Sequence, residues 1–141
     1  MPPVVYNFVA GGAADETTIR WNRECFGEIK LRQRVLRDLA GLDPSVTLFG
    51  KNHPMPIMLA PTAGHRYTHP EGELATAQGA GALGTTMILS SGTHTAIEDV
   101  MKVARAPVWY QLYVVKDRAI TAALVERVQA AGAEALCVTV D

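Results

Sequence analysis

The architecture of the chain is clearest in residues 86–141, which read TMILSSGTHTAIEDVMKVARAPVWYQLYVVKDRAITAALVERVQAAGAEALCVTVD. Short apolar runs recur there at Thr86–Ser90, Val108–Tyr113 and Ala135–Val140, and another precedes them at Pro56–Ala60. Each run is almost continuously apolar, which is typical of strands that are buried on both faces of a sheet. We therefore predict four strands.

Helical patterns separate these runs, at about Glu71–Leu83, Thr95–Ala104 and Ala119–Ala131. In the last of them, apolar residues recur at close to the 3.6-residue period of a helix. Asp117 precedes this helix as a candidate cap, and Gly132 follows it where a left-handed residue is favoured. The alternation of strand and helix predicts an α/β fold with a parallel sheet and right-handed crossovers.

The first fifty residues follow a different pattern. Asp15–Ile29 is predicted to be a helix, because acidic residues favour its start. Arg34–Leu39 and Val46–Gly50 are candidate short strands on either side of the turn at Leu42–Ser45. We therefore predict that residues 1–50 form a helical and hairpin cap that packs against the βα region.

Composition and charge narrow the class of protein. The chain has 141 residues, of which 48% are hydrophobic and 19% charged, as in globular domains. Its formal net charge of -1 argues against nucleic-acid binding, and no apolar run is long enough for a membrane span. We see no signal-peptide pattern, and Cys25 and Cys137 lack C-x-x-C spacing, so free thiols are favoured over a disulfide. These features together predict a cytoplasmic location.

Two local patterns have a plainer explanation than the function they suggest. Gly79–Gly84 matches G-x-G-x-x-G, but it closes a helix instead of following a strand, so we interpret it as a closely packed helix end. His65 and His69 are four residues apart, but Gly64 and Pro70 beside them favour a loop over a metal site.

Polar side chains at the ends of the strands are more informative. In parallel α/β folds, ligand-binding groups gather at the carboxyl ends of the strands. A single polar residue there is equally well explained as a local hydrogen-bonding group, but four strands that each supply one favour a ligand site. The residues concerned are Thr62, Ser90, Ser91, Gln111, Tyr113, Thr139 and Asp141.

Six ordered stretches of the chain resemble the FMN-dependent 2-hydroxy-acid oxidases and dehydrogenases, a family of enzymes that oxidise glycolate, lactate and mandelate. They are AGGAADE (10–16), LAPTA (59–63), HPEGE (69–73), LSS (89–91), YQLY with KDR (110–113 and 116–118) and VTVD (138–141). The resemblance implies a TIM (β/α)8 barrel, with residues 51–141 as its first half (strands 1–4). It also implies an FMN site formed by Pro61, Thr62, Ala63, Ser90, Gln111 and Thr139.

The resemblance further implies roles near the substrate. Tyr113 would direct its hydroxyl at the substrate, and Asp141 would support a histidine base by stabilising its imidazolium form. Phe8 stands where many members have a tyrosine that helps to hold the substrate carboxylate. Gly92 stands where oxidases of short hydroxy acids often carry a bulky aromatic residue, so we expect room for an aryl substrate such as a mandelate-type acid.

The implied function is FMN-dependent oxidation of a small 2-hydroxy acid to the 2-oxo acid, with oxidase and dehydrogenase both open. Family members are more than twice as long, and their flavin-contacting lysine, base histidine and carboxylate-binding arginine lie in the second half. We therefore expect this segment, as the N-terminal part of the enzyme, to be inactive alone. A non-catalytic flavin-binding half-barrel fragment or scaffold is the main alternative, and a half barrel that binds a phosphate ligand for different chemistry is another.

A half barrel also predicts partners. Its inward-facing apolar side chains would lack cover, and its first and last strands would present unpaired edges. We expect the C-terminal half of the barrel, or self-association into a homo-oligomer, to cover them.

Overall fold

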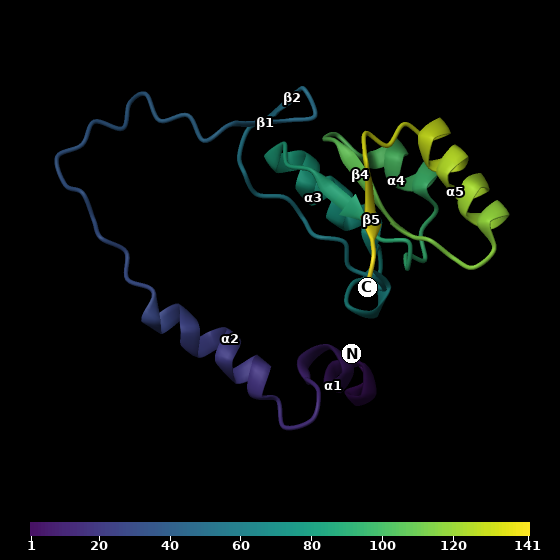
Figure 1. Cartoon of the computed structure of the whole chain (residues 1–141), viewed down its shortest axis with the longest axis horizontal. Coiled ribbons are helices and arrows are strands. Elements are labelled where there is room, and N and C mark those ends of the chain that lie inside the picture. Colours follow the sequence, from purple (N-terminus) through teal and green to yellow (C-terminus); the bar gives the residue numbers. More distant parts are fainter. The chain divides into compact units, whose positions relative to one another are not determined.

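The structure is a computed structural model that describes all 141 residues (Figure 1). The chain divides into two compact units, Met1–Asp43 and Pro44–Asp141. The parallel sheet and the helices next to it belong to the second unit. The predicted cap of residues 1–50 extends past this division, and its packing on the βα region stays a prediction.

The first unit contains two helices, α1 (Pro3–Ala10) and α2 (Thr17–Glu28), neither of which has a buried residue. Helix α1 begins with proline at its first position, where the missing N–H is not needed. Helix α2 lies within the predicted Asp15–Ile29 helix and confirms it. The predicted strand at Arg34–Leu39 is wrong, because no strand pairs with these residues and Leu36 has a φ of 57°, outside the β region.

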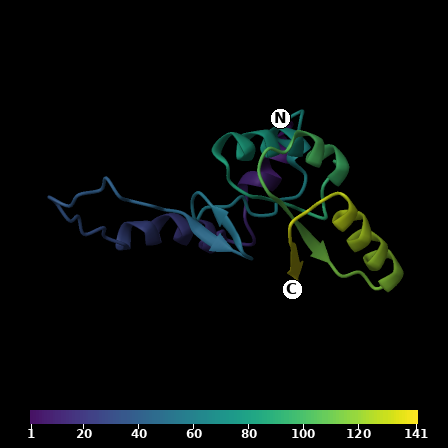
Figure 2. The same cartoon turned by 90° about the horizontal axis from the view of Figure 1, so that it is seen from above.

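A short hairpin opens the second unit. Strand β1 (Val46–Leu48) pairs antiparallel with β2 (Lys51–His53), which Figure 2 shows as two blue arrows. Phe49 and Gly50 join the strands, and both have positive φ, 50° and 76°, as a type I′ turn requires. The predicted strand at Val46–Gly50 therefore pairs with the residues that follow it, Lys51–His53. Contrary to our prediction, it does not pair with Arg34–Leu39.

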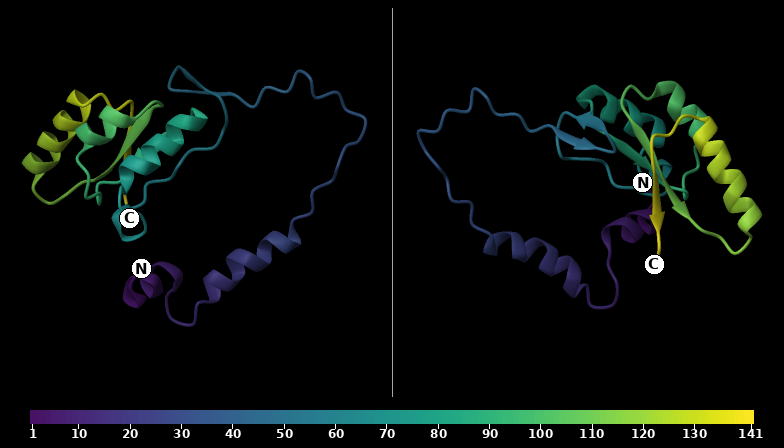
Figure 3. Two further views of the ribbon diagram at one scale, coloured as in Figure 1. Left: turned by 180° about the vertical axis from the view of Figure 1, so that it is seen from behind. Right: turned by 45° about the horizontal axis from the view of Figure 1, so that its top comes forward.

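The sheet of the second unit contains β3 (Met87–Leu89), β4 (Val108–Tyr113) and β5 (Leu136–Thr139), in that order and all parallel. Figure 3 shows β4 and β5 running in the same direction with helix α5 beside them. We predicted one more strand, at Pro56–Ala60, before these three. In the structure this segment forms no strand, and a single parallel bridge joins its Leu59 to Met87 of β3. Prolines at 56 and 61 remove backbone donors on either side of Leu59, which limits the pairing.

Three helices alternate with these strands: α3 (Glu73–Leu83), α4 (Ile97–Val103) and α5 (Arg118–Ala130). The Asp117 carboxylate caps α5 by accepting a hydrogen bond of 2.9 Å from the backbone N–H of Ala119, which confirms the predicted cap. Gly84 ends α3 with a φ of 66°, so the G-x-G-x-x-G stretch is the end of a helix, as predicted.

One hydrophobic core joins the three helices to a single face of the sheet. On β4 the residues of this core alternate, at Val108, Tyr110 and Leu112, and Gln111 between them lies on the opposite face. Strands in sequential order with all their helices on one face form a singly wound α/β unit, in which a partial barrel fits. The core residues are Ala77, Ala80, Met87, Leu89, Ile97, Val100, Val108, Tyr110, Leu112 and Val128.

Strand β5 is one edge of this sheet, and apolar side chains on it and just after it remain exposed. Leu136, Val138 and Val140 are 42%, 50% and 89% exposed.

No helix of the chain is both long enough and apolar enough to cross a membrane.

Candidate functional site

A cavity of about 660 Å³ lies where the carboxyl ends of β3, β4 and β5 meet the segment at residues 61–63. It contains eight of the eleven residues that the sequence analysis named for the site. A hollow of about 750 Å³ near the C-terminal ends of α3 and α4 is larger, but it contains no residue from a strand end. The smaller cavity is lined by Pro61, Ala63, Ser90, Ser91, Gly92, Gln111, Tyr113, Val115, Leu124 and Thr139.

The side-chain amide of Gln111 links the ends of all three strands. Its oxygen accepts hydrogen bonds from the hydroxyls of Ser90 (3.3 Å) and Ser91 (3.2 Å) and from the backbone N–H of Ser91 (3.1 Å). Its nitrogen donates to Thr139 Oγ1 at 2.7 Å. Because a backbone N–H can only donate, the amide oxygen must face Ser91 and the nitrogen must face Thr139.

This network leaves hydrogen-bond donors free at the cavity. Gln111 is 3% exposed, and its amide nitrogen has two N–H groups, of which one bonds Thr139. Thr139 accepts that bond, so its own hydroxyl proton is available to a ligand. The site can therefore present two donors, in fixed positions, to the carbonyl oxygens of a flat heterocycle.

Gly92 allows two backbone segments to approach closely. Its N–H donates to Ser90 Oγ at 3.1 Å, and a Cβ at this position would lie 2.9 Å from the Cβ of Ala63. Close packing against Ala63 therefore explains why residue 92 is a glycine. Whether it also makes room for an aryl substrate stays a prediction.

Three predicted site residues lie outside the cavity. Thr62 lines a separate hollow of about 450 Å³ with His65 and His69, and its hydroxyl donates to the carbonyl of Ala60 at 3.4 Å. The Thr62 side chain therefore does not line the same cavity as Ser90, Gln111 and Thr139, although its neighbours Pro61 and Ala63 do, and its predicted contact with FMN stays a prediction. Phe8 belongs to α1 of the first unit, so its predicted role stays a prediction.

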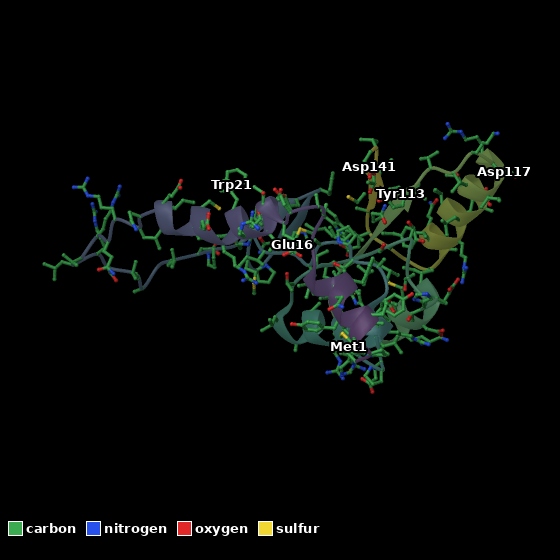
Figure 4. The ribbon with its side chains drawn as sticks, turned by 90° about the horizontal axis from the view of Figure 1, so that it is seen from below. Met1, Glu16, Trp21, Tyr113, Asp117 and Asp141 are labelled. Carbon is green, nitrogen blue, oxygen red and sulfur yellow. The ribbon has the colours of Figure 1, made fainter.

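The two residues with predicted catalytic roles lie at or just after the ends of neighbouring strands (Figure 4). Tyr113 lines the cavity at the end of β4 and is 49% exposed. Asp141 comes two residues after the end of β5, is exposed, and does not line the cavity. Their predicted roles stay predictions.

A buried carboxylate, Glu73, lies behind the site and was missed by the sequence analysis. Glu73 is fully buried at the first position of α3 and accepts a hydrogen bond of 2.7 Å from the Thr95 hydroxyl. Burial raises the pKa of Glu73, but the hydrogen bond from Thr95, together with the nearby polar groups of its own backbone, Thr93 and His65, outweighs this effect and holds the pKa below its ordinary value. The acidic first turn was visible in the sequence, but its partner, 22 residues away, was not.

The fold and the cavity define a singly wound α/β protein with a polar ligand site at its strand ends. The sequence model of the FMN-dependent dehydrogenases matches residues 1–141, and the chain belongs to this family. FMN is the cofactor of the family.

Individual relatives agree with this assignment. Glycolate oxidase 3 of Arabidopsis thaliana and glycolate oxidase of Spinacia oleracea are each 44% identical to the chain over 141 residues, which is all of this chain and 38% of each relative. The structure is similar to that of mandelate oxidase with (S)-2-phenylpropionate, with a TM-score of 0.90, 33% identity, and coverage of 100% of this chain and 42% of that one. A mandelate oxidase variant with a C4a-OH-FMN adduct is also similar, with a TM-score of 0.89, 32% identity, and coverage of 99% of this chain and 42% of that one. The chain thus spans about two fifths of the length of these relatives.

Proposed function

We propose that the chain is the N-terminal part of an FMN-dependent enzyme that oxidises a small 2-hydroxy acid to the 2-oxo acid. The observation that carries the proposal is the buried Gln111 amide, which joins three strand ends and leaves donors at the cavity. The names of the similar proteins, glycolate oxidase and mandelate oxidase, support small 2-hydroxy acids as the substrate class.

The lining of the cavity suits a flat flavin ring. Pro61 and Ala63 supply an apolar wall, while Gln111 and Thr139 supply donors for the carbonyl oxygens of the ring, and Ser90 fixes the Gln111 amide. When bound, FMN would accept the two electrons that leave the substrate. The protein residues would orient the substrate and hold water away from it.

Tyr113 and Asp141 would act on the substrate side. Tyr113, which is half-exposed and lines the cavity, would donate a hydrogen bond from its hydroxyl to an anionic substrate. Asp141 would hold the imidazolium of a histidine base, because a nearby carboxylate favours the charged form of the ring. Gly92 leaves the segment after β3 without a side chain, which agrees with an aryl substrate.

We further infer that the sheet belongs to a (β/α)8 barrel. The sequential strand order, with every helix on one face, is the arrangement that closes into a barrel when more βα units are added. The exposed row formed by Leu136 and Val138 on the edge strand β5, and by Val140 just after it, agrees with a further βα unit or a second copy covering it. The cytoplasmic location also stays a proposal, based on the sequence alone.

A flavin titration tests this proposal. We expect the chain, alone or joined to the rest of a barrel, to quench the fluorescence of FMN on binding. Gln111→Leu is expected to weaken binding about tenfold, the equivalent of ~1.4 kcal/mol, because it removes the amide donor. Gln78→Leu, at an exposed position on α3, is the matched control and should bind as the unaltered chain does.

Anaerobic addition of glycolate, lactate or mandelate to the chain joined to the rest of a barrel then separates the enzyme from the scaffold, because the chain alone is expected to be inactive. Bleaching of the bound flavin would support the enzyme, whereas binding without bleaching would support a flavin-binding scaffold. Equal FMN affinity of the chain, Gln111→Leu and Gln78→Leu would contradict the assignment of the site.

A further inference from the structure

Glu73 carries the one buried carboxylate of the chain, and the proposed function does not use it. Its Oε2 accepts the hydrogen bond from Thr95, while its Oε1 is buried without a hydrogen-bond partner. A buried charge with a single side-chain partner costs more in desolvation than an apolar side chain of similar size. Stability alone therefore does not explain a glutamate at this position.

Hydrogen bonds connect Glu73 to the cavity through the segment Ser90–Thr95, which joins β3 to α4. The Thr95 hydroxyl donates to Glu73, and the Thr95 backbone N–H donates to Thr93 Oγ1 at 2.9 Å. The Thr93 backbone N–H in turn donates to the carbonyl of Ser90 at 3.2 Å. Ser90 then bonds the Gln111 amide in the cavity.

We propose that Glu73 is a positioning residue, which fixes the Ser90–Thr95 segment through Thr95 and so sets the positions of Ser90, Ser91 and Gly92 at the cavity. A hydrogen bond to a carboxylate is about twice as strong as one between neutral groups, so the anchor is stronger than a glutamine would make it. The proposal rests on the proposed function only in naming FMN as the ligand that these residues meet.

A simpler role for Glu73 would be to stabilise the N-terminus of α3 through the helix dipole. That role needs neither burial nor Thr95, because an exposed acid in the first turn provides it. The two roles therefore differ in what the loss of the Thr95 hydroxyl does. Loss of the Thr95 hydroxyl leaves the Glu73 charge at the helix terminus in place and removes only the hydrogen bond between Thr95 and Glu73.

Hydrogen exchange of the full chain, measured by mass spectrometry, distinguishes these roles without FMN. In the unaltered chain, the amides of Ser91, Gly92, Thr93 and Thr95 are hydrogen-bonded, so peptides from this segment should be protected. Thr95→Val should speed exchange of the segment about tenfold relative to peptides from β4. Thr95→Ser keeps the hydroxyl and should restore protection, and Glu73→Gln should give an intermediate rate.

Glu71→Gln is the matched control, because it removes the same charge from an exposed position two residues away and should change nothing. The proposal is contradicted if Thr95→Val leaves exchange unchanged, if the unaltered segment already exchanges at unstructured rates, or if β4 loses protection equally. FMN affinity, measured on the same variants, should be highest for the unaltered chain, lower for Glu73→Gln and lowest for Thr95→Val, because the exchange rate of the segment should rise in that order. Absence of FMN binding both to the chain and to the chain joined to the rest of a barrel would refute the proposed function, while the exchange result would still decide the role of Glu73.

Discussion

Replacing Gly92 with alanine tests the geometry of the cavity at its closest contact. The added Cβ would lie 2.9 Å from the Cβ of Ala63, where carbon atoms in contact lie about 3.5–4.0 Å apart, so the two segments must separate by about 0.5–1 Å. Added methyl groups in packed sites cost ~1–3 kcal/mol. Both residues are exposed, so we expect the lower end, ~1 kcal/mol.

Gly79→Ala is the matched control for this variant. Gly79 lies within α3, and no atom lies within 4 Å of the Cβ that it would gain. Alanine is favoured over glycine inside a helix by about 0.5–1 kcal/mol, so this variant should be more stable than the unaltered chain. The same chemical change is thus expected to have opposite signs at the two positions.

Urea unfolding followed by circular dichroism measures both variants, and FMN titration follows on the same samples. We expect Gly92→Ala to lower the free energy of unfolding and to weaken FMN binding several-fold, because the wall at Ala63 moves. A Gly92→Ala chain that is as stable as Gly79→Ala, with unchanged FMN affinity, would refute the close contact.

Three further predictions concern the network, a cap and an ion pair. Gln111→Leu should lower the free energy of unfolding by about 1–3 kcal/mol in urea, because the partly buried Ser91 N–H loses its acceptor; a change below about 0.5 kcal/mol would contradict the network. Asp117→Ala should cost ~1 kcal/mol through loss of the α5 cap, whereas Asp117→Asn should cost much less, and equal losses would argue against capping. The hydrogen bond from Arg127 lowers the pKa of Glu98 from its ordinary value near 4.5 to about 2, so the stabilisation is present above pH 4.5 and is lost as the pH falls through about 2. The stability difference between the chain and Glu98→Gln should accordingly vanish near pH 2, and a difference that does not depend on pH would contradict this ion pair.

Much of the second unit was predictable because its signals are local. The apolar runs at Val108–Tyr113 and Ala135–Val140, and the helical period after Asp117, correspond to β4, β5 and α5 with ends that agree within two residues. Each signal depends on a period that the chain itself repeats. The strand ends then placed Ser90, Gln111 and Thr139 together without further information.

The failures have a different physical origin. The hairpin was paired the wrong way because its turn uses Phe49 with a φ of 50°, a conformation that bulky residues rarely adopt. The sequence did not show that the Thr62 side chain lines a separate hollow, because the strand-end rule says which end a residue lies at, but not which way a loop side chain points. The role of Glu73 depends on Thr95, a partner that only the folded chain brings near.

The measurement that tests the account most directly is an NMR titration of the chain with FMN. We expect the largest shifts at the Gln111 side-chain amide and at the backbone amides of Ser91 and Gly92, with the amides of Lys102 and Arg105 at the other hollow unchanged. Shifts confined to Lys102 and Arg105, or no shift at Gln111 on saturation with FMN, would contradict a flavin site at the strand ends.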